Sequence, residues 1–426
     1  MHSLVSQRKD LKFWVTNVCR VLIAAVFLFS GYAKGADPTG MAYKVGAYFQ
    51  YWGIPFSDAS LMVQGCVVAL AAVEFVMGLY LLLGIRRRLT SIAVFAFMTV
   101  MTALTVYIYV YSPVSDCGCF GEAVKLSNGQ TLAKNLVLWP MSLLVMLWNR
   151  RLSRFISERN QWLVSIYAWV YIFALSLHSF HYLPAVDFTS YKVGTDLRKA
   201  MQSEMVTTLT YEKAGQRRDF PMDSLPGPEW KFVDSRTEVV KPATVTDFFL
   251  LDAEGGDVAP QLLDDTSYVF LLTIPEAATA DDGCNDRVND LYDFAVDHGY
   301  AFYAAASATP QEIEAWCDKT GASYPFLTAD RDMLRSAVRS NPGMLLLHDG
   351  KIVAKWSNNN LPEKLETWQP AQGEREQSEA GRLPLYMRQL LWFLVPLFVV
   401  IFGDSIWIAS KYYKRYRHKK LLNQEQ

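Results

Sequence analysis

Six long apolar stretches constrain this chain of 426 residues more than any other feature. A bilayer core requires about 20 mostly apolar residues per helix, and the segments that reach this length are 13–33, 61–83, 89–111, 132–148, 162–183 and 390–409. The fourth contains Pro140, which neighbouring helices of a bundle can shelter. Only 19% of the residues are charged, against about 25% in soluble chains. The sequence therefore predicts a membrane protein with one large water-exposed domain before its last span.

Cationic residues cluster at alternate connections between these spans. The clusters are Arg8, Lys9 and Lys12; Arg86, Arg87 and Arg88; Arg150, Arg151, Arg154 and Arg159; and Lys411, Lys414, Arg415, Arg417, Lys419 and Lys420. The positive-inside rule then places both termini in the cytoplasm and residues 34–60, 112–131 and 184–389 outside it, in the periplasm of a bacterial inner-membrane protein. A second interpretation makes the first span a cleaved signal peptide ending at Ala33, which would leave the remaining topology unchanged. The net charge of -1 gives no reason to expect nucleic acid as a partner.

Ionisable side chains inside the spans are candidates for function, because burying a charge in lipid is costly. Glu74 lies near the middle of the second span. It is either a hydrogen-bonded structural residue or a group that transfers a proton or contacts a ligand. Lys34 and Arg20 lie near span ends, where long side chains are expected to snorkel towards water. Asp404 is assigned no function.

The sharpest local signal is the sequence Asp116-Cys117-Gly118-Cys119-Phe120-Gly121, directly after the third span. Two thiols one residue apart can bond only through a small ring, for which Gly118 supplies backbone freedom. Strained disulfides are more often the labile or catalytic ones. Three interpretations stay open: a redox-active pair, a structural disulfide, and a site for a soft metal ion. Cys66, at a similar depth in the second span, is a candidate resolving thiol, whereas Cys19 is interpreted as a small apolar residue of the bundle.

These motifs together resemble the DoxX-like membrane proteins, and in particular the branch that includes the methylamine-utilisation protein MauE. The resemblance covers residues 13–150 and depends on Arg20, Phe29-Ser30-Gly31-Tyr32-Ala33-Lys34, Glu74-Phe75 and Cys117-Gly118-Cys119-Phe120-Gly121. It implies a four-helix membrane domain linked to redox chemistry of the cell envelope, in which MauE-type members help a partner enzyme to acquire disulfides. Other DoxX relatives are associated with quinone-linked oxidation, so quinone is the cofactor that the resemblance suggests.

Strands and helices alternate in the water-exposed half. Residues 267–274 form an apolar run suited to a central strand, helices are expected at 285–298 and from Pro310 to Gly321, and a hairpin turns at Asp349-Gly350. This order, β-α-β-α-β-β, resembles a thioredoxin-like domain over residues 246–368. The resemblance implies that Pro342 is the cis-proline that faces the active site of that fold.

The expected Cys-x-x-Cys motif is missing from this domain. Cys284 lies near the expected place, but no second cysteine accompanies it, and Asp281, Asp282 and Asp286 oppose its ionisation. Cys284 is therefore either a catalytic thiol or an inert one in a redox-inactive domain. Cys317 is interpreted as a packing residue. His178 and His181 share a helical face, where an interfacial polar pair is the preferred interpretation over a metal or quinone contact.

The sequence thus predicts a four-helix transmembrane bundle over 13–150, a fifth helix over 161–183, a connecting region over 184–245, the thioredoxin-like domain over 246–368, a sixth helix over 390–410 and a basic tail over 411–426. The predicted function is exchange of electrons between client thiols and a membrane acceptor such as quinone, through Cys117 and Cys119, with Cys66 behind them and Glu74 handling a proton. The alternative is a non-catalytic envelope scaffold whose thioredoxin-like domain binds a partner protein. The polar segment 369–380 is interpreted as a linker.

Overall fold

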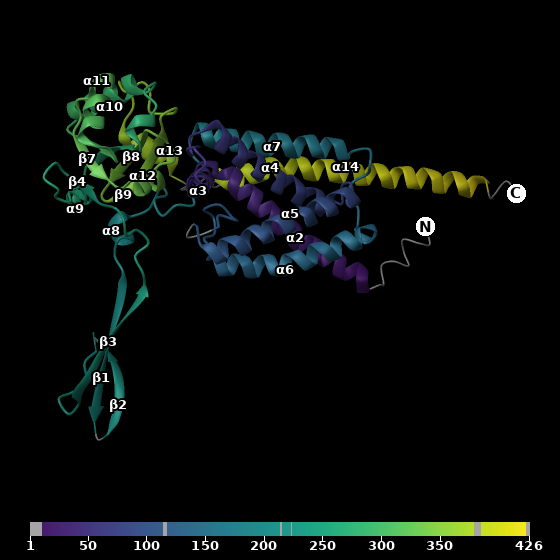
Figure 1. Ribbon diagram of the computed structural model, residues 1–426, viewed down its shortest axis with the longest axis horizontal. Coiled ribbons are helices and arrows are strands. Elements are labelled where there is room, and N and C mark those ends of the chain that lie inside the picture. Colours follow the sequence, from purple (N-terminus) through teal and green to yellow (C-terminus); the bar gives the residue numbers. More distant parts are fainter. Residues whose placement is uncertain (1–10, 114–116, 214, 223, 379–384, 423–426) are drawn as a thin grey trace. The chain divides into compact units, whose positions relative to one another are not determined.

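The computed structural model describes residues 11–113, 117–213, 215–222, 224–378 and 385–422 (Figure 1). Several predicted features lie outside the described residues: Arg8, Lys9, Asp116 and the side chains of 414–420. The chain divides into two compact units, Met1–Phe188 with Glu379–Gln426, and Thr189–Ser378. The second unit is therefore inserted into the first.

The first unit is helical. Its helices are α2 (Leu11–Ala36), α3 (Pro38–Tyr51), α4 (Leu61–Leu83), α5 (Arg87–Tyr111), α6 (Asn128–Leu147), the short 3-10 helix η2 (Asn149–Arg151), α7 (Gln161–His181) and α14 (Leu385–Leu422). Six of them, α2, α4, α5, α6, α7 and residues Leu385–Lys411 of α14, are long and apolar enough to cross a membrane. The six predicted spans and the multi-pass membrane fold are confirmed.

Helices α2 and α4 cross at two glycines. A Cβ atom on Gly31 would lie 2.4 Å from the backbone nitrogen of Phe75, and one on Gly78 would lie 2.8 Å from that of Leu28. Only glycine permits two backbones to approach this closely, which is how small residues pack membrane helices. This crossing explains why the Ser30-Gly31 motif contains glycine, and it makes α2 an integral part of the bundle.

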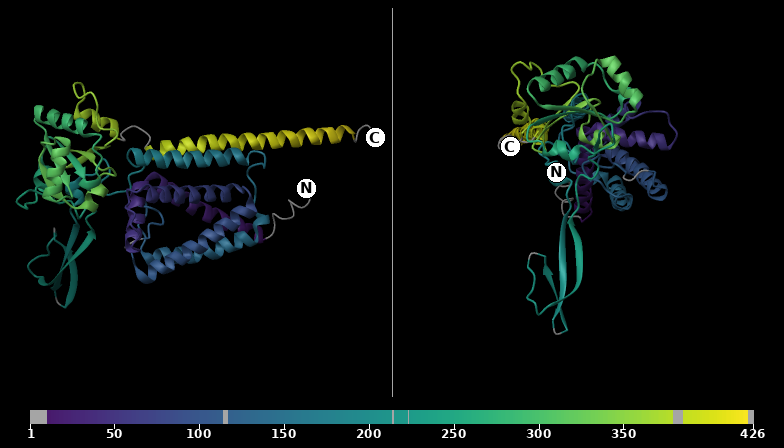
Figure 2. Two further views of the ribbon diagram at one scale, coloured as in Figure 1. Left: turned by 45° about the horizontal axis from the view of Figure 1, so that its top comes forward. Right: turned by 90° about the vertical axis from the view of Figure 1, so that its left-hand side faces the viewer.

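Helices α7 and α14 lie side by side (Figure 2). Pro396 cannot donate the usual hydrogen bond to the carbonyl of Trp392, and the Tyr167 hydroxyl donates to that carbonyl instead, at 2.6 Å. Further along α14, the buried carboxylate of Asp404 accepts hydrogen bonds from the backbone and hydroxyl of Ser157 and from the Asn160 amide. Asp404, which the sequence analysis left without a role, therefore fixes α14 to the connection between α6 and α7.

Arg20 corrects the expectation that it snorkels towards water. Its side chain is fully buried and donates to the carbonyls of Leu81 and Ser153, each at 2.8 Å. Arg87 donates to the Leu152 carbonyl at 2.6 Å. The Arg20 guanidinium thus links the last turn of α4 to the connection after α6, and the Arg87 guanidinium links the start of α5 to the same connection. The predicted cationic clusters 86–88 and 150–159 lie at this same end of the bundle.

The second unit contains two sheets. The smaller is antiparallel, in the order β2-β1-β3, with β1 (Glu204–Lys213), β2 (Gln216–Pro221) and β3 (Lys231–Lys241). The short helix α8 (Leu197–Ala200) precedes it. The sequence analysis expected only extended connecting chain over 184–245, because these residues lack an alternating apolar pattern. The reason is visible in β3, which is exposed along its whole length.

The larger sheet has the strand order β4-β7-β6-β5-β8-β9. Its elements are β4 (Leu250–Leu251), α9 (Ala259–Asp264), β5 (Tyr268–Ile274), η3 (Ala277–Thr279), α10 (Asn285–Asp297), β6 (Ala301–Ala306), α11 (Pro310–Thr320), β7 (Phe326–Ala329), α12 (Arg331–Ala337), β8 (Gly343–His348), β9 (Lys351–Ser357) and α13 (Pro370–Gln377). The central strand β5 is almost wholly buried, parallel to β6 and antiparallel to β8.

This topology confirms the predicted thioredoxin-like domain. The β8–β9 hairpin turns at Asp349-Gly350, α11 starts at Pro310 and ends at Thr320 with Gly321 as its C-cap, and the peptide bond before Pro342 is cis. The short helices α9 and η3 were not predicted, and neither were β7, α12 and α13. Strand β7 and helix α12 add an extra β-α step before the hairpin, and α13 occupies most of the segment interpreted as a linker.

Candidate functional site

The Cys-Gly-Cys loop between α5 and α6 brings its two thiols together. The sulfur atoms of Cys117 and Cys119 lie 3.1 Å apart as free thiols, about 1 Å more than the length of a disulfide bond. Gly118 has a φ of +67°, in the left-handed region that favours glycine. The predicted need for glycine between the cysteines is therefore visible in the backbone.

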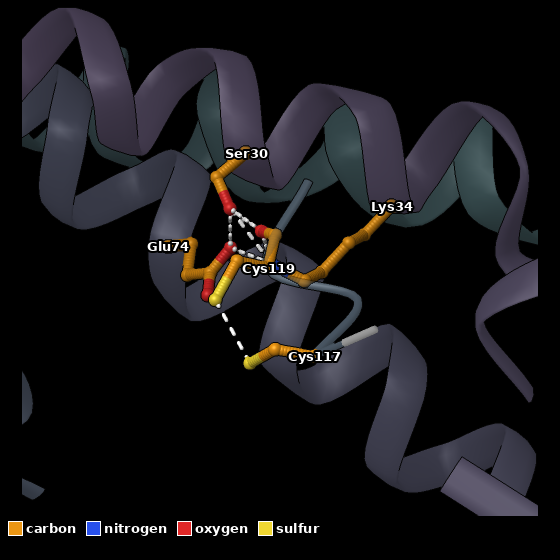
Figure 3. A network of polar contacts seen from close by, with 5 residues as sticks. All are labelled: Ser30, Lys34, Glu74, Cys117 and Cys119. Atoms are coloured by element: carbon orange, nitrogen blue, oxygen red, sulfur yellow. Dashed lines mark hydrogen bonds and ion pairs between the residues drawn. The ribbon is translucent and has the colours of Figure 1, made fainter. Parts of the chain in front are cut away.

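A buried polar network holds this loop against α2 and α4 (Figure 3). The Lys34 ammonium donates to the Glu74 carboxylate at 2.6 Å, to the Ser30 hydroxyl at 2.7 Å and to the Cys119 carbonyl at 2.6 Å. The Ser30 Oγ atom lies 2.6 Å from both Glu74 Oε2 and the Cys119 carbonyl oxygen. All three donors of the ammonium group are used.

Lys34 also corrects the prediction of snorkelling, since only 1% of it is exposed. It lies one helical turn after Ser30, so both side chains point to the same side of α2, where Glu74 of α4 meets them. The geometry gives Glu74 a structural role as the counter-ion of Lys34. The hydrogen bonds made to Glu74 by the described residues all end on Oε2, and its role in proton transfer stays a prediction from the sequence.

The two thiols differ in acidity. The pKa of Cys119 is lowered, mainly because the Cys117 thiol donates a hydrogen bond to its sulfur; burial opposes this, and the cations of Lys134 and Lys34 assist it. The pKa of Cys117 is raised by the same hydrogen bond and by burial. Cys119 is therefore the more acidic member of the pair.

Lys134 is a site residue that the sequence analysis missed. It lies on α6, and its Nζ atom lies 4.3 Å from the ring centroid of Phe120. The Phe120 ring in turn packs edge-on against Phe29, with the ring centroids 5.4 Å apart. A lone lysine inside the predicted span 132–148 is itself a signal for function, and this signal could have identified Lys134.

A small cavity of about 30 Å³ adjoins Cys119 and is lined by residues of α2, α4, α5 and α6. Its polar lining residues are Ser30, Glu74, Cys119, Lys134 and Asn135. This volume has room for about one water molecule and is too small for a quinone ring. A quinone, the acceptor that the resemblance suggests, therefore does not fit in this cavity, and we derive no step through it here.

The other membrane cysteines and the histidine pair lie apart from this network. Cys66 is exposed on α4, eight residues before Glu74, which is about 12 Å along a helix. Cys19 is buried in a cluster with residues such as Ile23 and Leu81, as expected of a packing residue. His178 and His181 are exposed, and both rings contact Tyr182. Within the described ranges, no group of three or more potential metal-ligating side chains is found.

Cys284 is the N-cap residue of α10 in the thioredoxin-like domain, but it is buried in the core of that domain, with 2% exposed. Burial, and then the charge of Asp281, raises its pKa to about 11. Burial also raises the pKa of Cys317 on α11. This environment favours the inert interpretation of Cys284, because the thiolate is the reactive form of cysteine.

Comparisons with known proteins agree with the sequence motifs. Residues 12–149 match the model of the family described as Methylamine utilisation protein MauE, and residues 205–242 match a domain of unknown function, DUF8463. No curated protein matches the chain. Among solved structures, a Bacteroides thetaiotaomicron protein described as a candidate protein disulfide isomerase is 17% identical, with a TM-score of 0.24 over 34% of this chain and 91% of that chain. The resemblance predicted from the motifs is thus confirmed: the first four membrane spans of this chain are similar to the MauE family.

Proposed function

We propose that this chain is a membrane thiol–disulfide exchange protein whose working pair is Cys117 and Cys119. The observation that supports this proposal is the 3.1 Å approach of the two sulfur atoms in a loop whose Cys119 carbonyl is held by the buried Lys34–Glu74–Ser30 network. A pair that must open and close repeatedly needs a fixed support, and the network supplies one.

The exchange step balances without a further reactant. A client thiolate attacks Cys117 of the oxidised pair, the Cys117–Cys119 bond breaks, and Cys119 leaves as a thiolate. The lower pKa of Cys119 favours this order, because thiols of lower pKa leave faster. A second client thiolate then displaces Cys117, so that the client gains a disulfide and the pair receives its two electrons.

The proposed setting is the periplasmic face of a bacterial inner membrane, with both termini cytoplasmic. The gathering of the cationic connections at one end of the bundle supports this orientation, and disulfides persist in such an oxidising compartment. Regeneration of the disulfide requires an acceptor of two electrons and two protons, for which a membrane quinone remains the prediction of the sequence analysis.

A second candidate function is that of a scaffold. The buried Cys284, with its raised pKa, favours a thioredoxin-like domain that binds a client without oxidising it. Both roles can coexist in one chain, because they involve different units. The scaffold alone would be the function if Cys117 and Cys119 never change oxidation state.

Thiol trapping across a series of redox potentials tests the proposal. Membranes carrying the full chain are equilibrated at each potential, alkylated and mapped by mass spectrometry. We expect Cys117–Cys119 to titrate reversibly between about -120 and -230 mV, the range of exchange-active pairs. Cys66→Ala and Cys284→Ala are the matched controls and should titrate like the wild type. A pair that resists reduction to below about -300 mV, or never forms a disulfide, would overturn the proposal.

A further inference from the structure

We propose that Lys134 is the positioning residue that keeps Cys119 the anionic member of the cysteine pair. The inference rests on the proposed function, because it makes Lys134 the residue that determines which of the two sulfur atoms leaves in the exchange step. Lys134 acts through Cys119 and does not itself react.

The first argument is the position of Lys134. Its half-buried side chain lines the cavity that adjoins Cys119, together with Glu74 and Asn135. The Phe120 ring lies under its ammonium group, and a cation over an aromatic face is stabilised most where water is excluded. Since Phe120 follows Cys119 directly, the loop that carries the thiol also fixes the cation beside it.

The second argument is that no carboxylate partner of Lys134 is found among the residues that the structure describes. Lys34 pairs with Glu74, and both Lys44 and Lys125 pair with Glu122. Among the ion pairs of the described residues, none includes Lys134. A cation inside a membrane bundle is costly unless an anion compensates it, and the Cys119 thiolate is the anion that lies within its reach.

The third argument is the balance of the charges that face Cys119. Helix α2 contributes Lys34 and α4 contributes Glu74, and these two opposite charges, which lie 2.6 Å apart, largely cancel. Helix α5 contributes only the uncharged Phe97, Met98 and Met101 to the shared cavity. Lys134 of α6 therefore determines the sign of the local potential. In accord with this, both lysines lower the pKa of Cys119 and Glu74 raises it.

The consequence is a polarised pair. With Lys134 present, Cys119 ionises and Cys117 keeps the proton, so that Cys119 is the sulfur that leaves when a client attacks. Stabilising the thiolate also stabilises the reduced pair, which makes the disulfide a stronger oxidant. Without the cation, the pair should become harder to reduce and slower to open.

The test compares the pH dependence of alkylation in reduced, full-length protein. Lys134→Met should shift the pH midpoint of Cys119 alkylation upwards by about one unit, with the sites distinguished by fragment mass spectrometry. Lys134→Arg keeps the charge and should stay near the wild-type midpoint. Lys125→Met removes an exposed lysine of the same loop and should have no effect.

A second measurement follows the equilibrium of the pair with glutathione. At pH 8, where Cys119 is ionised in both forms, Lys134→Met should shift this equilibrium about tenfold towards the disulfide, whereas Lys125→Met should not. If Lys134→Met leaves both the alkylation profile and this equilibrium unchanged, the inference is wrong, although the exchange function can stand. If the wild-type pair never cycles, the exchange function fails, and the alkylation profile still tests Lys134. Phe120→Leu, which should shift the alkylation midpoint in the same direction, tests the geometry should Lys134→Met fail to fold.

Discussion

At the scale of the residue, Lys34 and Glu74 show how a charged pair can persist inside a membrane bundle. Their ion pair is 2.6 Å long and nearly inaccessible to solvent, so that each charge depends on the other. Breaking such a pair leaves one uncompensated buried charge, whereas replacing both members by apolar side chains is often neutral. In this protein the pair has a further task, since Lys34 also holds the Cys119 carbonyl.

This dual role yields a prediction at the same scale. Glu74→Ala should destabilise the membrane unit by about 3–5 kcal/mol, whereas the double variant Lys34→Met/Glu74→Leu should recover most of that loss. Thermal unfolding in detergent measures both. The double variant should nevertheless fail to restore the wild-type redox potential of Cys117–Cys119, because the loop has lost its support. A double variant with normal stability and a normal potential would show that the network does not serve the cysteine pair.

At the scale of the element, the crossing of α2 and α4 determines whether the network can form. Ser30 and Lys34 flank Gly31, and Glu74 lies beside Phe75, whose backbone Gly31 contacts. The distance between the helices thus sets the distance between the charges.

Gly31→Leu should therefore disrupt both the bundle and the site. Overpacking typically costs about 1–3 kcal/mol. Because a Cβ atom at position 31 would lie only 2.4 Å from the Phe75 backbone nitrogen, we expect a value at the upper end of that range or above it. Gly65→Leu is the matched control. Gly65 lies on α4, and a Cβ atom at this glycine meets nothing within 4 Å. Thermal unfolding and the alkylation rate of Cys119 should change together in Gly31→Leu and stay unchanged in Gly65→Leu. Equal behaviour of the two variants would contradict this account.

The helices and strands were easier to predict from the sequence than the contacts between them. Apolar length predicted the six spans, and the motifs pointed to Ser30, Lys34, Cys117 and Cys119. The burial of Lys34 was not predictable, because its partners lie 40 and 85 residues away along the chain. Strand β7 is too short to give a local signal. Lys134 was overlooked although a lone lysine in a span is unusual.

At the scale of the whole molecule, the proposed orientation can be tested directly. Green fluorescent protein joined after residue 426 should fluoresce, and alkaline phosphatase joined there should be inactive, because the basic clusters favour the cytoplasm. The same reporters joined after residue 250 should give the opposite result. The reverse pattern at both sites would place the cysteine pair on the cytoplasmic face and remove the oxidising compartment from the proposal.

The insertion of the soluble unit between α7 and α14 also has a consequence for biosynthesis. About 200 residues separate these helices, and at about 5–20 residues per second a ribosome needs roughly 10–40 s to make them. Until α14 has been made, the hydrogen-bond donors of Ser157 and Asn160 lack their acceptor, the carboxylate of Asp404. The ribosome must therefore make a whole domain before the last helix is available to complete the bundle, and the unfinished bundle is the form that membrane quality control would meet first.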